Sequence, residues 1–225
     1  MPMLDPQTSV PSRVQALFAT MQAIVGASAV SCAIFIVGMT LLGSALDLSN
    51  QGESGGGMLA LNAAGLVAGF ALCRAMLDKS GLRSITAGKS FGAYFGLCIV
   101  TGLGTVMGFL LLIVPGVILL IRWLPAFGFL LGEGEGVSQS LSSSWNRTRG
   151  HFWVLLAGSV MPFLLLALAG GSYVMVGMGS AVPDSVWLIA ANLAIYASTA
   201  GWSAYGIAAY ALLKDERNAL SDVFG

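Results

Sequence analysis

Residues 112–156 read LIVPGVILLIRWLPAFGFLLGEGEGVSQSLSSSWNRTRGHFWVLL and hold most of the information on the fold. Near the start lies Pro115-Gly116, where proline removes a backbone donor and glycine permits a tight reversal. An apolar run over 117–132 follows and contains a single charge, Arg122. A Gly-Glu-Gly-Glu-Gly segment then ends the run. With the apolar residues 91–113 before the reversal, this order predicts a helical hairpin, which either crosses the whole bilayer or is re-entrant.

A short amphipathic helix is predicted over 137–149, directly after this stop. Its apolar residues recur every four positions and share one face, opposite the serines: Val137, Leu141 and Trp145. Gly150 is placed as a C-terminal helix stop. Trp153 then marks the return of the chain to the membrane interface. We therefore expect a surface-lying helix between two membrane spans.

The composition of the whole chain places it in a membrane. Of its 225 residues 56% are hydrophobic and 9% are charged, and the mean hydropathy is +0.85. Soluble domains carry about 25% charged residues, so most of this surface must face lipid. The net charge is zero, which gives no basic field for nucleic acid. Three cysteines, far apart in apolar runs, predict neither a disulfide framework nor a metal site.

The fold class predicted is therefore all-α, a polytopic bundle that forms a single transmembrane domain over 1–225. A spanning helix needs roughly 20 apolar residues. Six segments approach this length: 18–46, 58–77, 91–113, 117–132, 152–178 and 186–213. The fourth is the weakest because it is short and contains Pro125. Pro162 and the pair Gly170-Gly171 predict a bend in the fifth.

The positions of lysine and arginine predict the orientation of these spans. Nine of the ten basic residues fall on one side of a six-span arrangement, and segments 48–57 and 179–185 contain none. Because short cytoplasmic loops carry the excess of basic residues, both termini are expected in the cytoplasm.

The same central stretch resembles a group of bacterial membrane families. These are the glycerophosphoryl diester phosphodiesterase membrane-domain family and the related YciC-like proteins. The likeness rests on the following positions: Pro115, Gly116, Arg122, Glu133 or Glu135, Ser144, Trp145, Arg149, Gly150 and Trp153. The tail Tyr210-Ala-Leu-Leu is also similar. The resemblance implies six spans, and it implies a location in the bacterial inner membrane. It implies no activity, because catalysis in phosphodiesterase members belongs to a separate soluble domain that is not found in this sequence.

Arg122 is the leading candidate for a binding residue. With a turn at Pro115-Gly116 it lies about 10 Å below the outer edge, since each helical residue rises about 1.5 Å. A charge at that depth costs at least ~2.5 kcal/mol on insertion scales. It either contacts an anion or a lipid phosphate, or it snorkels to the interface or ties helices together through carbonyls such as that of Ile121. Asn62 and Asn192, on other spans, are further candidate partners.

The other polar residues near the interface suggest weaker roles. Arg147 and Arg149 lie where anionic headgroups are expected. Glu133 and Glu135 are expected to form a solvated stop, and His151 a polar anchor. No nucleotide loop, nucleophile elbow or acidic cluster supports catalysis, so neither a catalytic residue nor a cofactor is predicted.

Two functions follow from these features. The first is a non-enzymatic scaffold or lipid-interacting protein. The alternative is a transporter of a lipid or small anion that uses Arg122 within the membrane. Expected partners are membrane lipids, anionic phospholipids among them, and a second copy or another membrane protein.

Overall fold

The computed structural model describes residues 9–49, 55–84, 91–176, 178 and 182–224, with side chains described as far as Lys214. These residues form helices and no strand, which confirms the all-α class. The elements are α1 (Val10–Ala27), α2 (Ala29–Leu48), α3 (Gly55–Lys79), α4 (Phe91–Leu111), α5 (Ile113–Trp123), α6 (Ala126–Gly128), the π-helix η1 (Phe129–Glu133), α7 (Val137–Arg147), α8 (Phe152–Gly158), α9 (Val160–Met175) and α10 (Asp184–Phe224).

Several of these helices are long and apolar enough to cross a membrane. Within the described ranges four qualify: Ala29–Leu48, Gly55–Lys79, Phe91–Leu111 and Ile113–Glu133. The interrupted pair α8 and α9 makes five if the two helices form one broken span. The predicted sixth span, 186–213, lies inside α10 and is not among them, so six spans stay a prediction.

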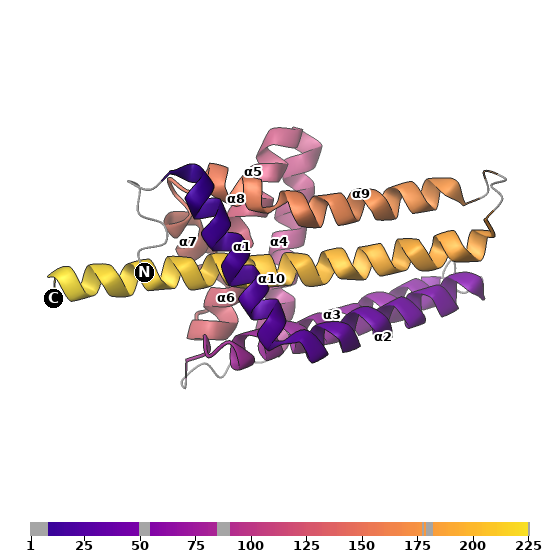
Figure 1. Ribbon diagram of the computed structural model, residues 1–225, viewed down its shortest axis with the longest axis horizontal. Helices are drawn as coiled ribbons and strands as arrows, with labels where there is room; N and C mark the ends of the chain where they lie inside the picture. Colours follow the sequence, from indigo (N-terminus) through magenta and orange to yellow (C-terminus); the bar gives the residue numbers. More distant parts are fainter. Residues whose placement is uncertain (1–8, 50–54, 85–90, 177, 179–181, 225) are drawn as a thin grey trace. The chain divides into compact units, whose positions relative to one another are not determined.

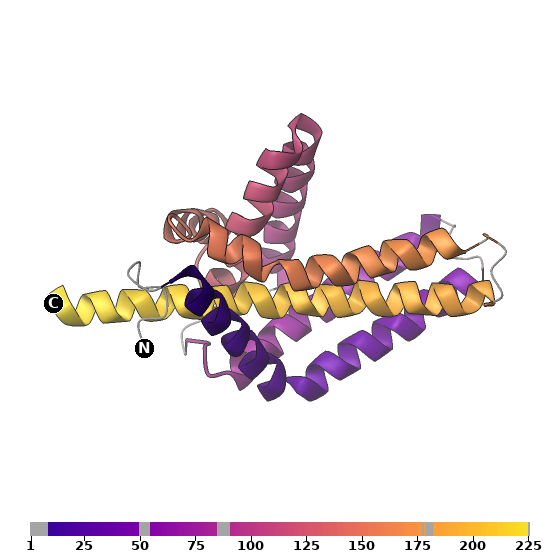
Figure 2. The ribbon, with the colours of Figure 1, turned by 45° about the horizontal axis from the view of Figure 1, so that its top comes forward.

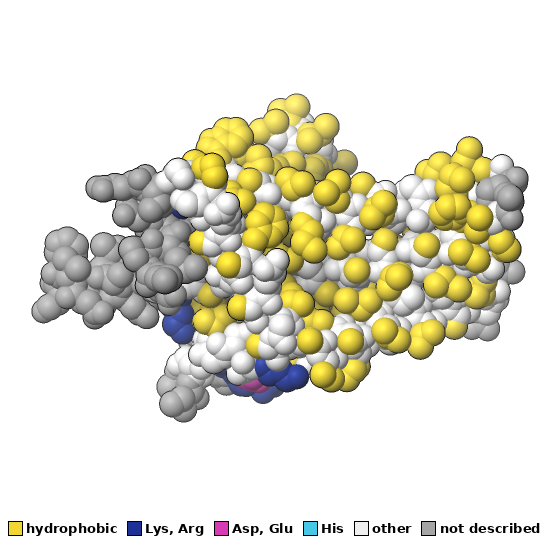
Figure 3. Space-filling view, viewed as in Figure 1, with side chains coloured by type: hydrophobic (Ala, Val, Ile, Leu, Met, Phe, Trp, Pro, Cys, Tyr) yellow, Lys and Arg dark blue, Asp and Glu magenta, His cyan; other side chains and the backbone are white. Residues whose placement is uncertain are grey.

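Contacts divide the chain into two compact units, where the sequence suggested one domain. Unit 1 comprises residues 1–28, 73–159 and 204–225, and unit 2 comprises 29–72 and 160–203. All ten lysines and arginines belong to unit 1. Unit 2 contains only acidic charges, Asp47, Glu53 and Asp184. In the face drawn in Figure 3, the helices of unit 2 accordingly show hydrophobic side chains and no basic ones.

The first predicted span, 18–46, is two helices instead of one. The chain breaks at Ser28, whose fully buried hydroxyl donates a 2.7 Å hydrogen bond to the carbonyl of Ile24. Such back-bonding by serine bends helices. The preceding α1 buries Leu17 and exposes polar residues such as Gln22. Helix α1 is not among the span-length helices, and the first of these begins at Ala29.

The fifth predicted span, 152–178, is interrupted at Ser159. Pro162 has no amide hydrogen to donate to the carbonyl of Gly158, four residues earlier, so the helix weakens there. The Ser159 hydroxyl instead donates to the carbonyl of Leu156 at 2.7 Å. The break thus lies three residues before the proline, whereas Gly170-Gly171 lies within continuous α9.

In unit 2 the first part of α10 packs between α2 and α9. The ring of Phe35 on α2 meets Tyr196 edge-on at 6.2 Å, and Phe163 on α9 meets Trp202 at 4.9 Å. The buried Ser198 hydroxyl donates to the carbonyl of Pro162 at 2.8 Å. Figures 1 and 2 show α2, α3, α9 and this part of α10 running side by side.

In unit 1 helices α4 and α5 form the predicted hairpin, which Figure 2 shows clearly. The chain reverses at Leu112, whose backbone is extended (φ −167°, ψ 151°), and not at Pro115-Gly116. Proline is tolerated in the first turn of α5 because no intrahelical bond needs its amide there. A Cβ at Gly116 would lie 2.5 Å from the Phe109 ring, so glycine lets the two arms touch.

A second close contact in unit 1 joins α6 and η1 to the later part of α10. A Cβ at Gly128 would lie 2.3 Å from the side chain of Tyr210, and one at Gly132 would lie 2.7 Å from its hydroxyl. The Phe129 and Tyr210 rings meet edge-on at 5.0 Å. Residues 126–132 are therefore largely covered by protein, although the sequence placed them inside a membrane span.

Candidate functional site

The candidate site forms where α5 ends and α7 packs against it. Pro125 closes α5, because a proline cannot continue the hydrogen bonds of the helix. The fully buried Ser144 on α7 donates a 2.6 Å hydrogen bond to the carbonyl of Arg122. The sequence pointed to the neighbouring carbonyl of Ile121 as the acceptor near this proline. In the structure it is the Arg122 carbonyl that receives a donor from another helix.

Arg122 lies under a tryptophan ring. Its guanidinium carbon is 4.4 Å from the centroid of Trp145, a cation–π distance. The two asparagines suggested as its partners bond elsewhere. Asn62 donates to the carbonyl of Met58 on its own helix at 2.9 Å, and Asn192 donates to the Asp47 carboxylate at 2.7 Å. Arg122 is thus tied to α7, which favours a structural role for its side chain.

Arg147, one turn from Ser144, makes a parallel contact. Its guanidinium carbon lies 4.6 Å from the centroid of Phe129, and Nη1 lies 3.9 Å from the carboxylate of Glu133. The two side chains are 23% and 17% exposed. Glu135 accepts a 3.0 Å hydrogen bond from Ser143. Glu133 and Glu135 therefore belong to a partly buried network and do not form the solvated stop that was expected.

The buried face of α7 differs from the expected one. Ser140, Ser144 and Thr148 have no exposed surface, whereas Val137, Leu141 and Trp145 are half-buried beside them. Small side chains allow α7 to lie close to α4, α5, α6 and η1, all of which it contacts. The exposed face carries Ser138, Gln139, Ser142 and Asn146. Serine therefore occupies both faces of this helix.

Arg149 is the predicted headgroup residue that reaches the surface. It is exposed and follows the end of α7 at Arg147, two residues before the predicted end. Gly150 adopts the left-handed backbone (φ +82°) that glycine accommodates best after a helix. Trp153 in the first turn of α8 is 71% exposed. An exposed arginine and an exposed tryptophan thus flank one tight turn.

A buried pair that the sequence did not predict joins α1 to the start of α8. Arg13 donates a hydrogen bond through Nη2 to Nδ1 of His151, and each residue is only 7% exposed. Burial, and then the neighbouring Arg13 charge, lower the pKa of His151. Neutral His151 therefore acts as an acceptor and not as a solvated polar anchor. The two residues are 138 positions apart, so no local pattern indicates the contact.

Unit 2 contains a polar cluster that the sequence also did not predict. Asp47 on α2 accepts from Asn192, which is 3% exposed. Buried Thr40, Gly43 and Ser44 share this face of α2, and a Cβ at Gly43 would lie 2.4 Å from the Asn192 amide oxygen. These positions recur every three or four residues, a spacing that places them on one face of a helix. The predicted span ended at residue 46, so Asp47 was left outside it and the shared face was not recognised.

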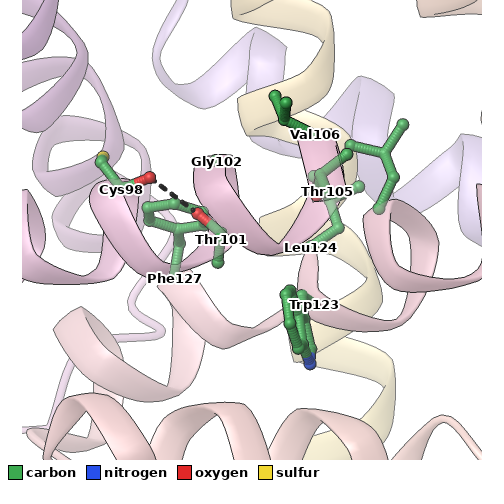
Figure 4. A pocket seen from close by; sticks show the side chains of 9 residues that line it. Cys98, Thr101, Gly102, Thr105, Val106, Trp123, Leu124 and Phe127 are labelled. Carbon is green, nitrogen blue, oxygen red and sulfur yellow. Dashed lines mark hydrogen bonds between the residues drawn. The ribbon is translucent and has the colours of Figure 1, made fainter. Parts of the chain in front are cut away.

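An apolar cavity of about 350 Å³ lies within unit 1 where α4 meets α5 and α6. Figure 4 shows the side chains that line it, with Phe127 next to Thr101 and Trp123 below Leu124 in this view. The Thr101 hydroxyl donates to carbonyls of its own helix, so it offers the cavity little polarity. Arg122 is not among the lining residues.

No known protein family, curated protein or solved structure matches this chain.

Proposed function

We propose that this chain is a non-enzymatic protein of the bacterial inner membrane that contacts anionic phospholipids and serves as a membrane scaffold. The observation that carries the proposal is the turn between α7 and α8, where exposed Arg149 lies four residues before exposed Trp153. Tryptophan is enriched at membrane–water interfaces, and an arginine there attracts phosphate headgroups. Arg122 and Arg147, stacked on aromatic rings, hold the turn's supporting helix in place.

The distribution of charge supports this placement. Unit 1 contains every lysine and arginine of the chain, and each basic residue near an anionic surface contributes about 1 kcal/mol of attraction. The proposed topology puts both termini in the cytoplasm, which requires an even number of crossings. That number is six if the α4–α5 hairpin crosses the bilayer and four if it does not.

The proposal extends to family membership. The motif over residues 112–156, with the Tyr210 tail, supports assignment to the membrane-domain group that includes the YciC-like proteins. Within this motif Ser144 and Trp145 are the residues that bind Arg122, and Gly150 forms the left-handed turn. These contacts give the motif a structural role, namely fixing α7 on the hairpin.

The alternative, a transporter that recognises a lipid or small anion at Arg122, has less support. Trp145 covers the guanidinium at 4.4 Å, and the cavity between α4, α5 and α6 is not lined by Arg122. A second copy of the chain or another membrane protein is the remaining proposed partner.

Native mass spectrometry from nanodiscs that contain equal amounts of phosphatidylglycerol and phosphatidylcholine tests the lipid contact. Arg149→Ala is expected to lower bound phosphatidylglycerol about fivefold, the equivalent of about 1 kcal/mol, whereas Arg149→Lys retains most of it. Arg83→Ala is the matched control, because it removes one positive charge that already pairs with Asp78 at 2.9 Å. Equal occupancy in wild type, Arg149→Ala and Arg83→Ala would exclude a specific contact at Arg149.

A further inference from the structure

The tip of the α4–α5 hairpin is apolar and uncovered. Residues 106–121 contain no polar side chain. Five consecutive large residues at the turn are each at least two-thirds exposed: Leu110 75%, Leu111 73%, Leu112 68%, Ile113 73% and Val114 67%. Loops that emerge from a membrane into water are normally polar and flanked by tryptophan, tyrosine or basic residues. None of these lies near this tip in the sequence.

The base of the hairpin, in contrast, is fixed near water by α7. The outer face of α7 exposes Ser138, Gln139, Ser142 and Asn146, which cannot lie in hydrocarbon without cost. This helix touches both arms. Ser144 bonds to α5 at Arg122, and a Cβ at Gly96 of α4 would lie 3.7 Å from Val137. The polar helix therefore sets the level of the membrane surface at Arg122.

Measured along α5 from Arg122, the hairpin is too short to cross. Ten residues separate Arg122 from Leu112, which at about 1.5 Å per residue gives about 15 Å. The hydrocarbon core is about 30 Å thick, so the tip reaches about its middle.

The segment after Arg122 does not face lipid. Residues 126–132 belong to the same apolar stretch, but Ala126, Phe129 and Leu130 have no exposed surface because protein covers them. A full crossing would move Arg122 to about the bilayer centre. A charge at that depth makes insertion less favourable by a factor of roughly a hundred in the equilibrium constant. The crossing would also place the five tip residues among the opposite headgroups.

We infer that the α4–α5 hairpin is a re-entrant wedge: it enters the bilayer from the side on which α7 lies, ends near the midplane, and has the acyl chains of a single leaflet as its partner. Its turn needs no water, because the Leu112 amide donates to Gly108 at 3.1 Å and the Gly116 amide donates to Leu112 at 3.4 Å. Backbone at membrane depth must be satisfied in this way. The wedge leaves both termini on one side with four crossings.

A spin label at the tip measures this depth directly. In a variant with Cys32, Cys73 and Cys98 changed to alanine, a label introduced by Leu112→Cys is compared with one introduced by Ser138→Cys, in liposomes. The readout is collision with oxygen, which concentrates at the midplane, and with a water-soluble nickel chelate. A third label at Leu41, exposed within α2, gives a reference inside the hydrocarbon.

The inference expects the Leu112 label to collide strongly with oxygen and to be shielded from nickel at least as well as the Leu41 label. The Ser138 label should remain open to nickel. A Leu112 label as open to nickel as the Ser138 label would overturn the inference and establish a full crossing. The inference rests on the proposed membrane location alone, so loss of phosphatidylglycerol binding would leave it intact, and a nickel-accessible tip would leave the headgroup contact intact.

Discussion

The hydroxyl of Ser144 lies 2.6 Å from the backbone carbonyl oxygen of Arg122, and the ring of Trp145, the next residue, lies over the Arg122 side chain at 4.4 Å. Two successive residues of α7 thus hold both the main chain and the side chain of one arginine. Because Pro125 interrupts the helix after Arg122, this end of α5 depends on α7 for its position.

Ser144→Ala should lower the free energy of unfolding by about 1–3 kcal/mol, the usual cost of leaving a buried acceptor without its donor. Thermal unfolding in a mild detergent measures the change. Ser138→Ala on the exposed face of the same helix serves as the control and should alter stability by less than about 0.5 kcal/mol. Equal effects of the two substitutions would mean that the Arg122 carbonyl does not need Ser144.

The stacking of Arg122 on Trp145 should appear as a coupling energy. A double-mutant cycle of Arg122→Ala and Trp145→Ala is expected to give about 0.5–2 kcal/mol, the range of cation–π pairs between exposed and desolvated sites. Arg122→Lys keeps the charge and should retain part of the coupling. If the stability effects of the two single substitutions simply add, the side chains are not coupled. Arg122 would then again be a candidate ligand contact.

The Arg13–His151 pair should make stability depend on pH. The folded-state pKa of His151 lies below its ordinary value of about 6.5, so the unfolded chain binds more protons as the pH falls through 6.5. Stability contributed by neutral His151 is therefore complete above about pH 6.5. It is lost as the pH falls toward the folded-state pKa.

His151→Asn provides the comparison, because its amide oxygen can accept from Arg13 but does not titrate. Unfolding of both proteins is followed between pH 5 and pH 8. The difference in free energy of unfolding between wild type and His151→Asn should shrink or reverse at acid pH, because only wild type loses stability there. Parallel curves would show that His151 does not titrate in this range.

Gly116→Ala should separate the arms of the hairpin. The added Cβ would lie 2.5 Å from the Phe109 ring and 2.8 Å from its backbone nitrogen, and backbone cannot move aside cheaply. Overpacking of this kind costs about 1–3 kcal/mol. Gly102→Ala on α4 is the matched control, because nothing lies within 4 Å of its added Cβ. Thermal unfolding should distinguish the two, and a neutral Gly116→Ala would contradict the close contact.

In unit 2, Asn192→Leu should remove the donor to Asp47 and destabilise the contact between α2 and α10. Hydrogen bonds between membrane helices average about 0.6 kcal/mol and reach about 1.7 kcal/mol. A double-mutant cycle with Asp47→Ala, read by unfolding in detergent, should give a coupling within this range. Asn62→Leu is a control, since Asn62 bonds only within its own helix among the contacts described. A coupling near zero would remove the pair as a stabilising contact.

Sequence periodicity and length were sufficient for the helical class and for the hairpin around 91–132, because both depend on local chemistry. The end of α7 near Gly150 was predictable for the same reason, since a left-handed position selects glycine. The helix break at Ser28 was not predicted, and the bend of the fifth span was predicted from Pro162 but not placed at Ser159. Serine is common in continuous helices, where its hydroxyl also donates to preceding carbonyls, as Ser172 does to Leu168 within α9, so the residue type alone does not mark a break.

The candidate site was predictable in its residues but not in its contacts. Arg122, Trp145 and Arg149 were all identified, yet the stacking of Arg122 on Trp145 joins residues 23 positions apart and depends on how α7 docks. The inner face of α7 was assigned by hydrophobicity. Close packing selected small residues there instead, Ser140 and Ser144. His151 and Arg13 carry no shared pattern at all.

The confinement of every lysine and arginine to unit 1 has an energetic consequence during biosynthesis. Moving one positive charge outward against a membrane potential of 100 mV requires about 2.3 kcal/mol. With the proposed orientation, threading segments 48–57 and 179–185 through the insertion machinery exports no such charge. The negative charges of Glu53 and Asp184 move outward instead, which the membrane potential favours. The cell's own electrical gradient therefore assists the insertion of unit 2 and opposes its inversion.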